Sequence, residues 1–132
     1  MEIKEKTISK QYTVLIVDDD EIIIDYQKRI FEKQGYKVLT AKSGEEALEV
    51  YYSERHIINA VVLDLIMDGM GGIACLREIL KTDPKANVLI TSGYLANDKI
   101  NKTLNSGAKA FLGKPYRIKD LVDEVHKLIG KP

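Results

Sequence analysis

The chain has 132 residues, 45% of them hydrophobic and 30% charged, which is typical of one globular domain. Twenty Lys and Arg residues balance twenty Asp and Glu residues, so no basic field favours direct nucleic-acid binding. The apolar runs are far shorter than the roughly 20 residues of a membrane helix, and the charged N-terminus lacks the apolar centre of a secretory signal. We therefore predict a cytoplasmic protein without a membrane span.

Short apolar runs alternate with segments of helical spacing, which indicates βα units around a parallel sheet. Five units are predicted over residues 12–130, after a tail at residues 1–11. The first strand covers residues 13–17 and ends at a run of acidic residues. A helix follows over residues 21–34, and its predicted buried stripe consists of Ile23, Tyr26 and Ile30.

The second unit has a strand at residues 37–41 and a helix that ends near Arg55. Ser43 and Glu46 have the spacing of a capping box, in which each side chain bonds the other residue's amide. The predicted buried face of this helix consists of Ala47, Leu48, Tyr51 and Tyr52.

The third strand is predicted at residues 60–63, directly before Asp64, and its helix ends before Pro84. The fourth unit pairs a strand at residues 88–91 with a weakly anchored helix at residues 98–105. The fifth pairs a short strand at residues 110–112 with a strongly amphipathic helix. That helix carries Ile118, Leu121, Val122, Val125, Leu128 and Ile129.

Polar side chains follow four of these strands. They are Asp18 and Asp19 after the first strand, Asp64 after the third, Ser92 after the fourth and Lys114 after the fifth. Ligands of open α/β sheets bind beyond the carboxyl ends of the strands, so we expect these groups to converge there.

Three carboxylates in one cleft repel one another, and a hard cation with oxygen ligands relieves the repulsion. Mg²⁺ fits best, because it takes one or two carboxylates together with phosphate oxygens. A lysine and a hydroxyl suit a transferring phosphoryl group. Asp20 is assigned instead to the cap of the following helix, and the lone Cys75 to a packing role.

Four ordered blocks of this sequence resemble the response-regulator receiver domain of two-component signalling systems. They are residues 15–21, 61–67, 90–94 and 107–116. The resemblance covers about residues 12–130 and implies a flavodoxin-like (βα)5 fold. Such a fold has a doubly wound, parallel five-stranded sheet in the order 2-1-3-4-5, with helices on both faces.

The resemblance also implies residue roles. Asp64 would attack the phosphohistidine of a partner kinase, while Asp18, Asp19 and the backbone carbonyl of Ile66 would help Asp64 hold Mg²⁺. Lys114 would pair with the phosphoryl group, and Pro115 occupies the position of the family's cis-proline.

The switch is assigned to Ser92 and Phe111. Thr91 is also a hydroxyl residue, but the 22-residue spacing from Ser92 to Lys114 resembles that of the family. Ser92 would move toward the phosphate and Phe111 would turn inward behind it. The surface around the helix at residues 98–105 and the fifth strand would then repack as the output.

Three further positions near Asp64 are of interest. One departs from the family's usual pattern, and two correspond to positions that set the phosphoryl lifetime. Asp68 stands where the family usually has proline. Ile66 and Tyr94 occupy the two positions that set phosphoryl lifetime, and neither offers a carboxylate or amide to orient a hydrolytic water. Slow self-dephosphorylation is therefore expected.

The implied partners are a sensor histidine kinase or a histidine phosphotransfer protein, and a downstream protein or fused kinase domains. The chain is expected to be a monomer or a weak phosphorylation-dependent dimer. It is not expected to be an enzyme, because it would catalyse only its own phosphoryl transfer and slow dephosphorylation. It is interpreted as a stand-alone regulator, a relay carrier or the receiver of a hybrid kinase. Two alternatives are a receiver-like interaction module that is not phosphorylated and a haloacid-dehalogenase-type phosphohydrolase. The latter needs a second acid where this chain has Ile66.

Overall fold

The computed structural model describes residues 11–65, 67, 69–93 and 107–130. The strands in these ranges are β1 (Thr13–Val17), β2 (Lys37–Ala41), β3 (Ile58–Asp64), β4 (Val88–Ser92) and β5 (Ala110–Gly113). The helices are α2 (Glu21–Lys33), α3 (Gly44–Glu54), α4 (Gly72–Thr82) and α6 (Ile118–Ile129). None of these helices is long and apolar enough to cross a membrane. The predicted helix at residues 98–105 lies outside the described ranges.

The strands form one parallel sheet in the order β2-β1-β3-β4-β5, as predicted. All residues of β1 and β4 are buried, because helices cover both faces of the sheet. β2 and β3 lie on opposite sides of β1, so the direction of winding reverses there. The carboxyl ends of β1 and β3 therefore flank the switch point at which such sheets bind ligands.

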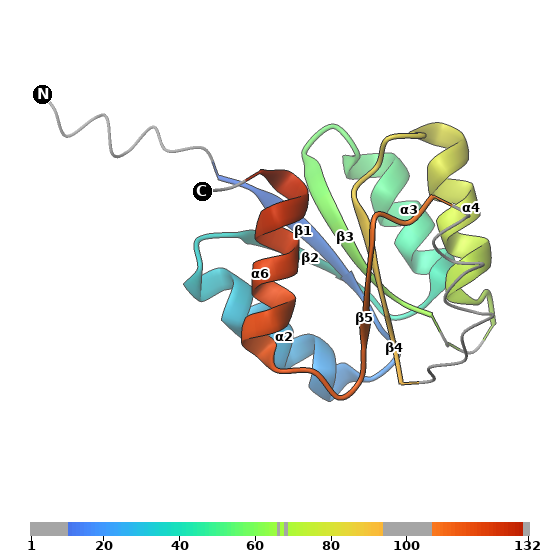
Figure 1. The fold of residues 1–132 in the computed structure, drawn as a ribbon. Coiled ribbons are helices and arrows are strands. Elements are labelled where there is room, and N and C mark those ends of the chain that lie inside the picture. Colours follow the sequence, from blue (N-terminus) through green and yellow to red (C-terminus); the bar gives the residue numbers. More distant parts are fainter. Residues whose placement is uncertain (1–10, 66, 68, 94–106, 131–132) are drawn as a thin grey trace, which may run out of the picture.

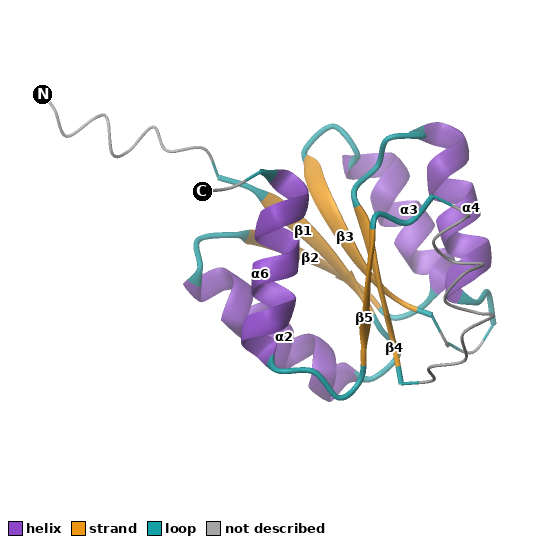
Figure 2. Cartoon of the chain, in the orientation of Figure 1, coloured by secondary structure: helices purple, strands orange, loops and turns teal. Residues whose placement is uncertain are grey.

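The sheet is the middle layer of three, with α2 and α6 on one face and α3 and α4 on the other (Figures 1 and 2). Each face has its own apolar core. The core on the α3 and α4 side includes Leu15, Val17, Leu63, Leu76 and Ile79. The core on the α2 and α6 side includes Val14, Ile16, Ile24, Phe31 and Leu121.

The helix starts follow the predicted capping chemistry with one change. The Asp20 carboxylate accepts hydrogen bonds from the amides of Ile22 and Ile23, at 2.9 and 3.4 Å. Ser43 Oγ accepts from the amide of Glu46 at 3.0 Å, as the capping box predicts. The Glu46 carboxylate, however, accepts from the amide of Lys42 at 2.9 Å and thus bonds one residue before the cap.

Two tyrosines predicted to be buried are exposed. Tyr26 on α2 is 54% exposed and Tyr52 on α3 is 47% exposed. The buried face of α2 instead contains Ile24, Gln27 and Phe31. Because three consecutive isoleucines stand at the start of α2, more than one face of the helix could be the buried one. The polar Gln27 lies on the face that is buried, so the sequence favoured the wrong face.

Candidate functional site

Three carboxylates meet where β1 and β3 end. Val17 pairs with Leu63 in the sheet, so the residues that follow them, Asp18 and Asp64, are neighbours. One carboxylate oxygen from each of Asp18, Asp19 and Asp64 lies within 4.8 Å of the others. The predicted convergence of these side chains is therefore present. β3 is longer than predicted, and Asp64 is its last residue rather than the first residue after it.

The carboxylates differ in burial and in hydrogen bonding. Asp18 and Asp64 are buried, at 4% and 6% exposure, whereas Asp19 is exposed. Asp18 Oδ1 accepts a hydrogen bond from the Asp20 amide at 3.0 Å, which holds it at the strand end. Asp20 itself caps α2, so the predicted separation of Asp20 from the acidic cluster is confirmed.

Lys114 brings one positive charge to this cluster from the end of β5. Its Nζ lies 3.6 Å from Asp18 Oδ2 and 3.8 Å from Asp64 Oδ1, and 26% of its side chain is exposed. Its backbone N–H donates to the carbonyl of Ser92 at 2.7 Å. The peptide bond between Lys114 and Pro115 is cis, as the resemblance to the receiver family implies.

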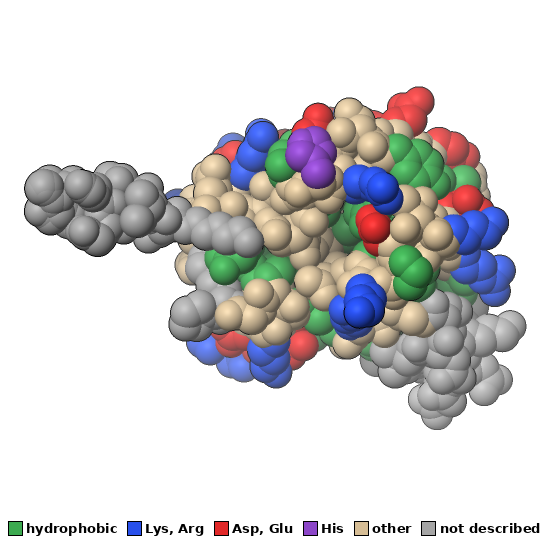
Figure 3. Space-filling view, turned by 90° about the horizontal axis from the view of Figure 1, so that it is seen from above, with side chains coloured by type: hydrophobic (Ala, Val, Ile, Leu, Met, Phe, Trp, Pro, Cys, Tyr) green, Lys and Arg blue, Asp and Glu red, His purple; other side chains and the backbone are tan. Residues whose placement is uncertain are grey.

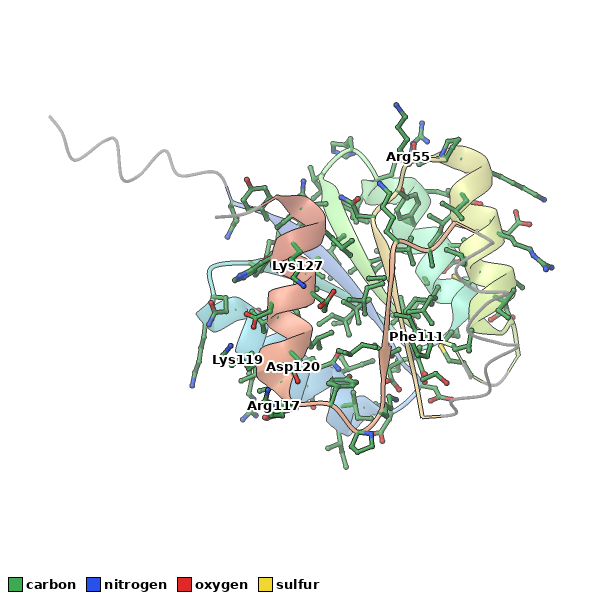
Figure 4. All side chains as sticks on the ribbon, in the orientation of Figure 1. Arg55, Phe111, Arg117, Lys119, Asp120 and Lys127 are labelled. Atoms are coloured by element: carbon green, nitrogen blue, oxygen red, sulfur yellow. The ribbon has the colours of Figure 1, made fainter. Side chains whose placement is uncertain are left out.

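Ser92 and Phe111 lie on the same face of the sheet. Ser92 ends β4 and is fully buried, and it alternates in phase with Val88 and Ile90 of the core on the α3 and α4 side. Phe111 pairs with Ile90 in the sheet and is half-buried against the same core (Figure 4). The structure thus places the two predicted switch residues on neighbouring strands and on one side.

The acidic cluster has the donor set that Mg²⁺ requires. Oxygens around Mg²⁺ at about 2.1 Å stand roughly 3 to 4 Å apart, which suits carboxylate oxygens grouped as closely as these. The cluster carries three formal negative charges against the single charge of Lys114, so a divalent cation would lower the repulsion. The site can therefore hold a hard cation next to a carboxylate and an ammonium group.

Comparison with known proteins decides the family. A profile of the response regulator receiver domain matches residues 14–126. The chain belongs to the response-regulator receiver family. The described fold and the convergent site agree with this assignment.

The receiver has relatives of very different total length. It is 36% identical to part of sensor kinase CckA from Brucella abortus, over 97% of this chain but 14% of that protein. It is 34% identical to chemotaxis protein CheY from Thermotoga maritima, over 87% of this chain and 95% of that protein. Sporulation initiation phosphotransferase F from Bacillus subtilis is 33% identical, over 88% and 92%.

Solved receiver structures share the fold. A receiver domain from Clostridium thermocellum superposes with a TM-score of 0.86 at 31% identity, over 91% of this chain and 95% of that one. CheY from Borrelia burgdorferi, crystallised in a CheX-CheY-BeF3-Mg complex, superposes with a TM-score of 0.84 at 33% identity, over 89% and 88%.

The end of β3 is packed directly against the start of α4. The Gly72 amide donates to the carbonyl of Leu65 at 2.9 Å. A Cβ atom at Gly72 would lie 2.5 Å from the Asp64 carbonyl oxygen and 2.6 Å from Leu65 Cα. Only glycine permits this approach, so Gly72 helps to set the backbone position of Asp64, a role that the sequence did not indicate.

A second contact that the sequence did not indicate joins α2 to the segment after Lys114. Gln27 Nε2 donates to the hydroxyl of Tyr116 at 2.7 Å. Burial and the charges of Asp18 and Asp64 raise the pKa of Tyr116, while the hydrogen bond from Gln27 lowers it. In the sequence, Gln27 stands at helical spacing between Ile24 and Phe31, and this pattern could have indicated a buried polar contact.

Three of the predicted positions fall outside the described residues. They are Ile66, Asp68 and Tyr94. The roles assigned to Ile66 in metal binding and to Ile66 and Tyr94 in phosphoryl lifetime therefore remain predictions.

Proposed function

We propose that this receiver accepts a phosphoryl group on Asp64 from a phosphohistidine in a two-component phosphorelay. The observation that carries the proposal is the grouping of three carboxylates within 4.8 Å, with Lys114 Nζ 3.8 Å from Asp64 Oδ1. Phosphoryl transfer depends mainly on positioning and on charge neutralisation, and this grouping supplies both.

In this proposal, a carboxylate oxygen of Asp64 forms the new bond to phosphorus as the bond to the histidine nitrogen breaks. The histidine leaves with the electron pair of that bond. Lys114 pairs with the oxygens of the phosphoryl group. Asp18, Asp19, Asp64 and the carbonyl of Ile66 are the proposed Mg²⁺ ligands. When bound, Mg²⁺ would neutralise charge on the transferring group.

The proposed switch follows from the added charge. An aspartyl phosphate carries roughly two negative charges, which the Ser92 hydroxyl and the Lys114 ammonium would bond. Ser92 and Phe111 lie on the same face of neighbouring strands, which supports a coupled movement of the two. The repacked output surface would lie around residues 98–105 and β5.

The proposed phosphodonor is a sensor histidine kinase or a histidine phosphotransfer protein. Two exposed apolar side chains on α2, Ile22 at 79% and Tyr26 at 54%, support a docking face for such a protein. A cavity of about 380 Å³ adjoins Tyr26, and its lining also includes Lys114 and Pro115. A donor seated here would lie next to the proposed acceptor site.

The remaining parts of the proposal concern context. The receiver unit is placed at residues 12–130, after a tail at residues 1–11, and is assigned to the cytoplasm. It would be a monomer or a weak phosphorylation-dependent dimer that passes its signal to a downstream protein or to fused kinase domains. Its own chemistry would be limited to phosphoryl transfer and slow dephosphorylation, because neither Ile66 nor Tyr94 has a carboxylate or amide to orient a hydrolytic water.

Beryllofluoride titration in Mg²⁺, followed by NMR, tests the proposed acceptor. Beryllofluoride imitates the phosphoryl group, so we expect resonances of Asp64, Ser92, Phe111 and Lys114 to shift in the wild type and not in Asp64→Asn. Asp20→Asn is the matched control, since it changes a neighbouring carboxylate but keeps the helix cap. An equal response in wild type and Asp64→Asn would refute the proposal and favour a receiver-like interaction module.

A further inference from the structure

Lys114 belongs to a short connection between β5, which ends at Gly113, and α6, which begins at Ile118. The backbone N–H of Lys114 is held by the Ser92 carbonyl. Its ammonium lies 3.6 Å from Asp18 and 3.8 Å from Asp64, which exceeds the roughly 2.8 Å of a charge-assisted hydrogen bond. The direction of this side chain therefore depends on how the connection itself is held.

The hydrogen bond between Gln27 and Tyr116 fastens the connection to α2. The two residues are 89 positions apart, and the donor–acceptor distance is 2.7 Å. Gln27 is only 4% exposed, so its amide needs a partner where it lies. The Tyr116 ring packs against the core between the sheet, α2 and α6. Gln27 is thus buried, and Tyr116 is partly buried against this core.

The same hydrogen bond joins two sides of the candidate site. α2 begins at Glu21, directly after the acidic run that contains Asp18, and Tyr116 follows Lys114 by two residues. The charges of Asp18 and Asp64 both raise the pKa of Tyr116, so its hydroxyl lies within electrostatic reach of the two carboxylates. A shift of Tyr116 away from α2 would move the base of the Lys114 side chain with it.

We propose that Gln27 and Tyr116 are positioning residues that keep the Lys114 ammonium directed at Asp64. The inference rests on the proposed function, because it concerns the lysine that would pair with the phosphoryl group. Neither residue is assigned a contact with that group. Both would act through Lys114 alone.

The first test compares Tyr116→Phe with the wild type in beryllofluoride affinity at saturating Mg²⁺. The variant keeps the ring and loses only the hydroxyl, so we expect affinity to fall about threefold to tenfold, the effect of one hydrogen bond. Mg²⁺ affinity without beryllofluoride should stay within about twofold. Tyr52→Phe, at an exposed tyrosine on α3, is the matched control and should behave as wild type.

A double-mutant cycle with Lys114→Ala separates positioning from a general structural effect. If Tyr116 acts through Lys114, Tyr116→Phe should weaken beryllofluoride binding no further in the Lys114→Ala background. Losses that multiply across the two sites would overturn the proposal.

A second variant protects the test against loss of stability. Gln27→Met combined with Tyr116→Phe replaces both hydrogen-bond partners by apolar groups, which should recover the free energy of unfolding lost in either single variant. Beryllofluoride affinity should stay low in this stable double variant. Recovery of full affinity would show that the contact serves stability only, which contradicts a positioning role.

The outcomes distinguish this inference from the proposed function. If the wild type binds no beryllofluoride in Mg²⁺, or if Lys114→Ala binds as tightly as the wild type, the proposed role of the site itself fails. If Lys114→Ala weakens binding while Tyr116→Phe equals the wild type, only the positioning inference fails.

Discussion

Polar side chains lie at both ends of the sheet, the amino end where the parallel strands begin and the carboxyl end where they finish. The two ends differ in how their charged side chains are paired. At the amino end, Tyr51 donates to Asp83 at 2.7 Å and Arg55 lies 3.5 Å from the same carboxylate. Lys109 Nζ donates to the carbonyl of Lys85 and to Asn87, at 2.8 and 3.0 Å. These contacts pair donors with acceptors, and Arg55 with the anion Asp83.

Figure 3 looks onto this amino end, where basic and acidic side chains lie beside one another around a hollow. The hollow is a cavity of about 540 Å³ whose lining includes Tyr51, Arg55 and Asp83. Arg55, labelled in Figure 4, lies in the connection between α3 and β3, at this amino end of the sheet. The polar groups here hold the ends of α3 and α4 together.

The carboxyl end of the sheet differs in its balance of charge. Among the described residues, three carboxylates there lie within 4.8 Å of one another and face Lys114, so negative charge is in excess. Like charges at such distances cost stability, which a protein tolerates where the charges serve chemistry. Substitutions of the paired groups at the amino end should therefore change stability alone, whereas substitutions within the carboxylate cluster should also change binding.

The largest effect is expected where the backbone of the carboxyl end is most tightly packed. Gly72→Ala would place a Cβ atom 2.5 Å from the Asp64 carbonyl oxygen, so the strand end or α4 must shift. We expect a loss of about 3 kcal/mol in the free energy of unfolding, measured by urea denaturation, together with weaker Mg²⁺ binding. Gly71→Ala is the control, because nothing lies within 4 Å of its Cβ position. Equal stability of the two variants would show that the close approach is not required.

Mg²⁺ should reverse the cost of the carboxylate cluster. At about 100 times its dissociation constant, Mg²⁺ should stabilise the wild type by about 2.7 kcal/mol. Without Mg²⁺, Asp64→Asn should be more stable than the wild type by about 1 kcal/mol, because one repulsive charge is removed. Asp83→Asn, at the amino end, should instead lose stability in both conditions. Thermal unfolding of Asp64→Asn and Asp83→Asn that responds identically to Mg²⁺ would break the contrast between the ends.

A smaller and purely structural effect is expected from the amino end. Tyr51→Phe removes the donor to Asp83 and should cost about 1.5 kcal/mol, the value of a hydrogen bond to a charged group. Burial and the bond to Asp83 both raise the pKa of Tyr51, so the hydroxyl is neutral and donates at neutral pH. Chemical denaturation should show the loss, while beryllofluoride affinity stays unchanged. Tyr52→Phe is the exposed control on the same helix, and an equal loss there would count against the assigned contact.

The contrast between the ends also shows which features a sequence reveals. Runs of β-branched residues marked the strands, and parallel strands bring their carboxyl ends together, so the grouping of Asp18, Asp64 and Lys114 was predictable. The Gln27–Tyr116 hydrogen bond was not, because it joins residues 89 positions apart through side-chain packing. The exposure of Tyr26 was missed for a related reason, since three adjacent isoleucines leave the phase of α2 ambiguous.

The smallest expected effect separates Asp20 from the carboxylates beside it. Asp20→Ala removes the acceptor for the amides of Ile22 and Ile23 and should cost about 1 kcal/mol of stability, whereas Asp20→Asn keeps an acceptor and should cost almost nothing. Neither variant should change Mg²⁺ affinity by more than about twofold, because Asp20 is turned toward the helix. Urea denaturation and Mg²⁺ titration by NMR measure the two quantities. If Asp20→Asn lowered Mg²⁺ affinity as much as Asp19→Asn does, Asp20 would belong to the cluster, and the boundary drawn between cap and metal site would be wrong.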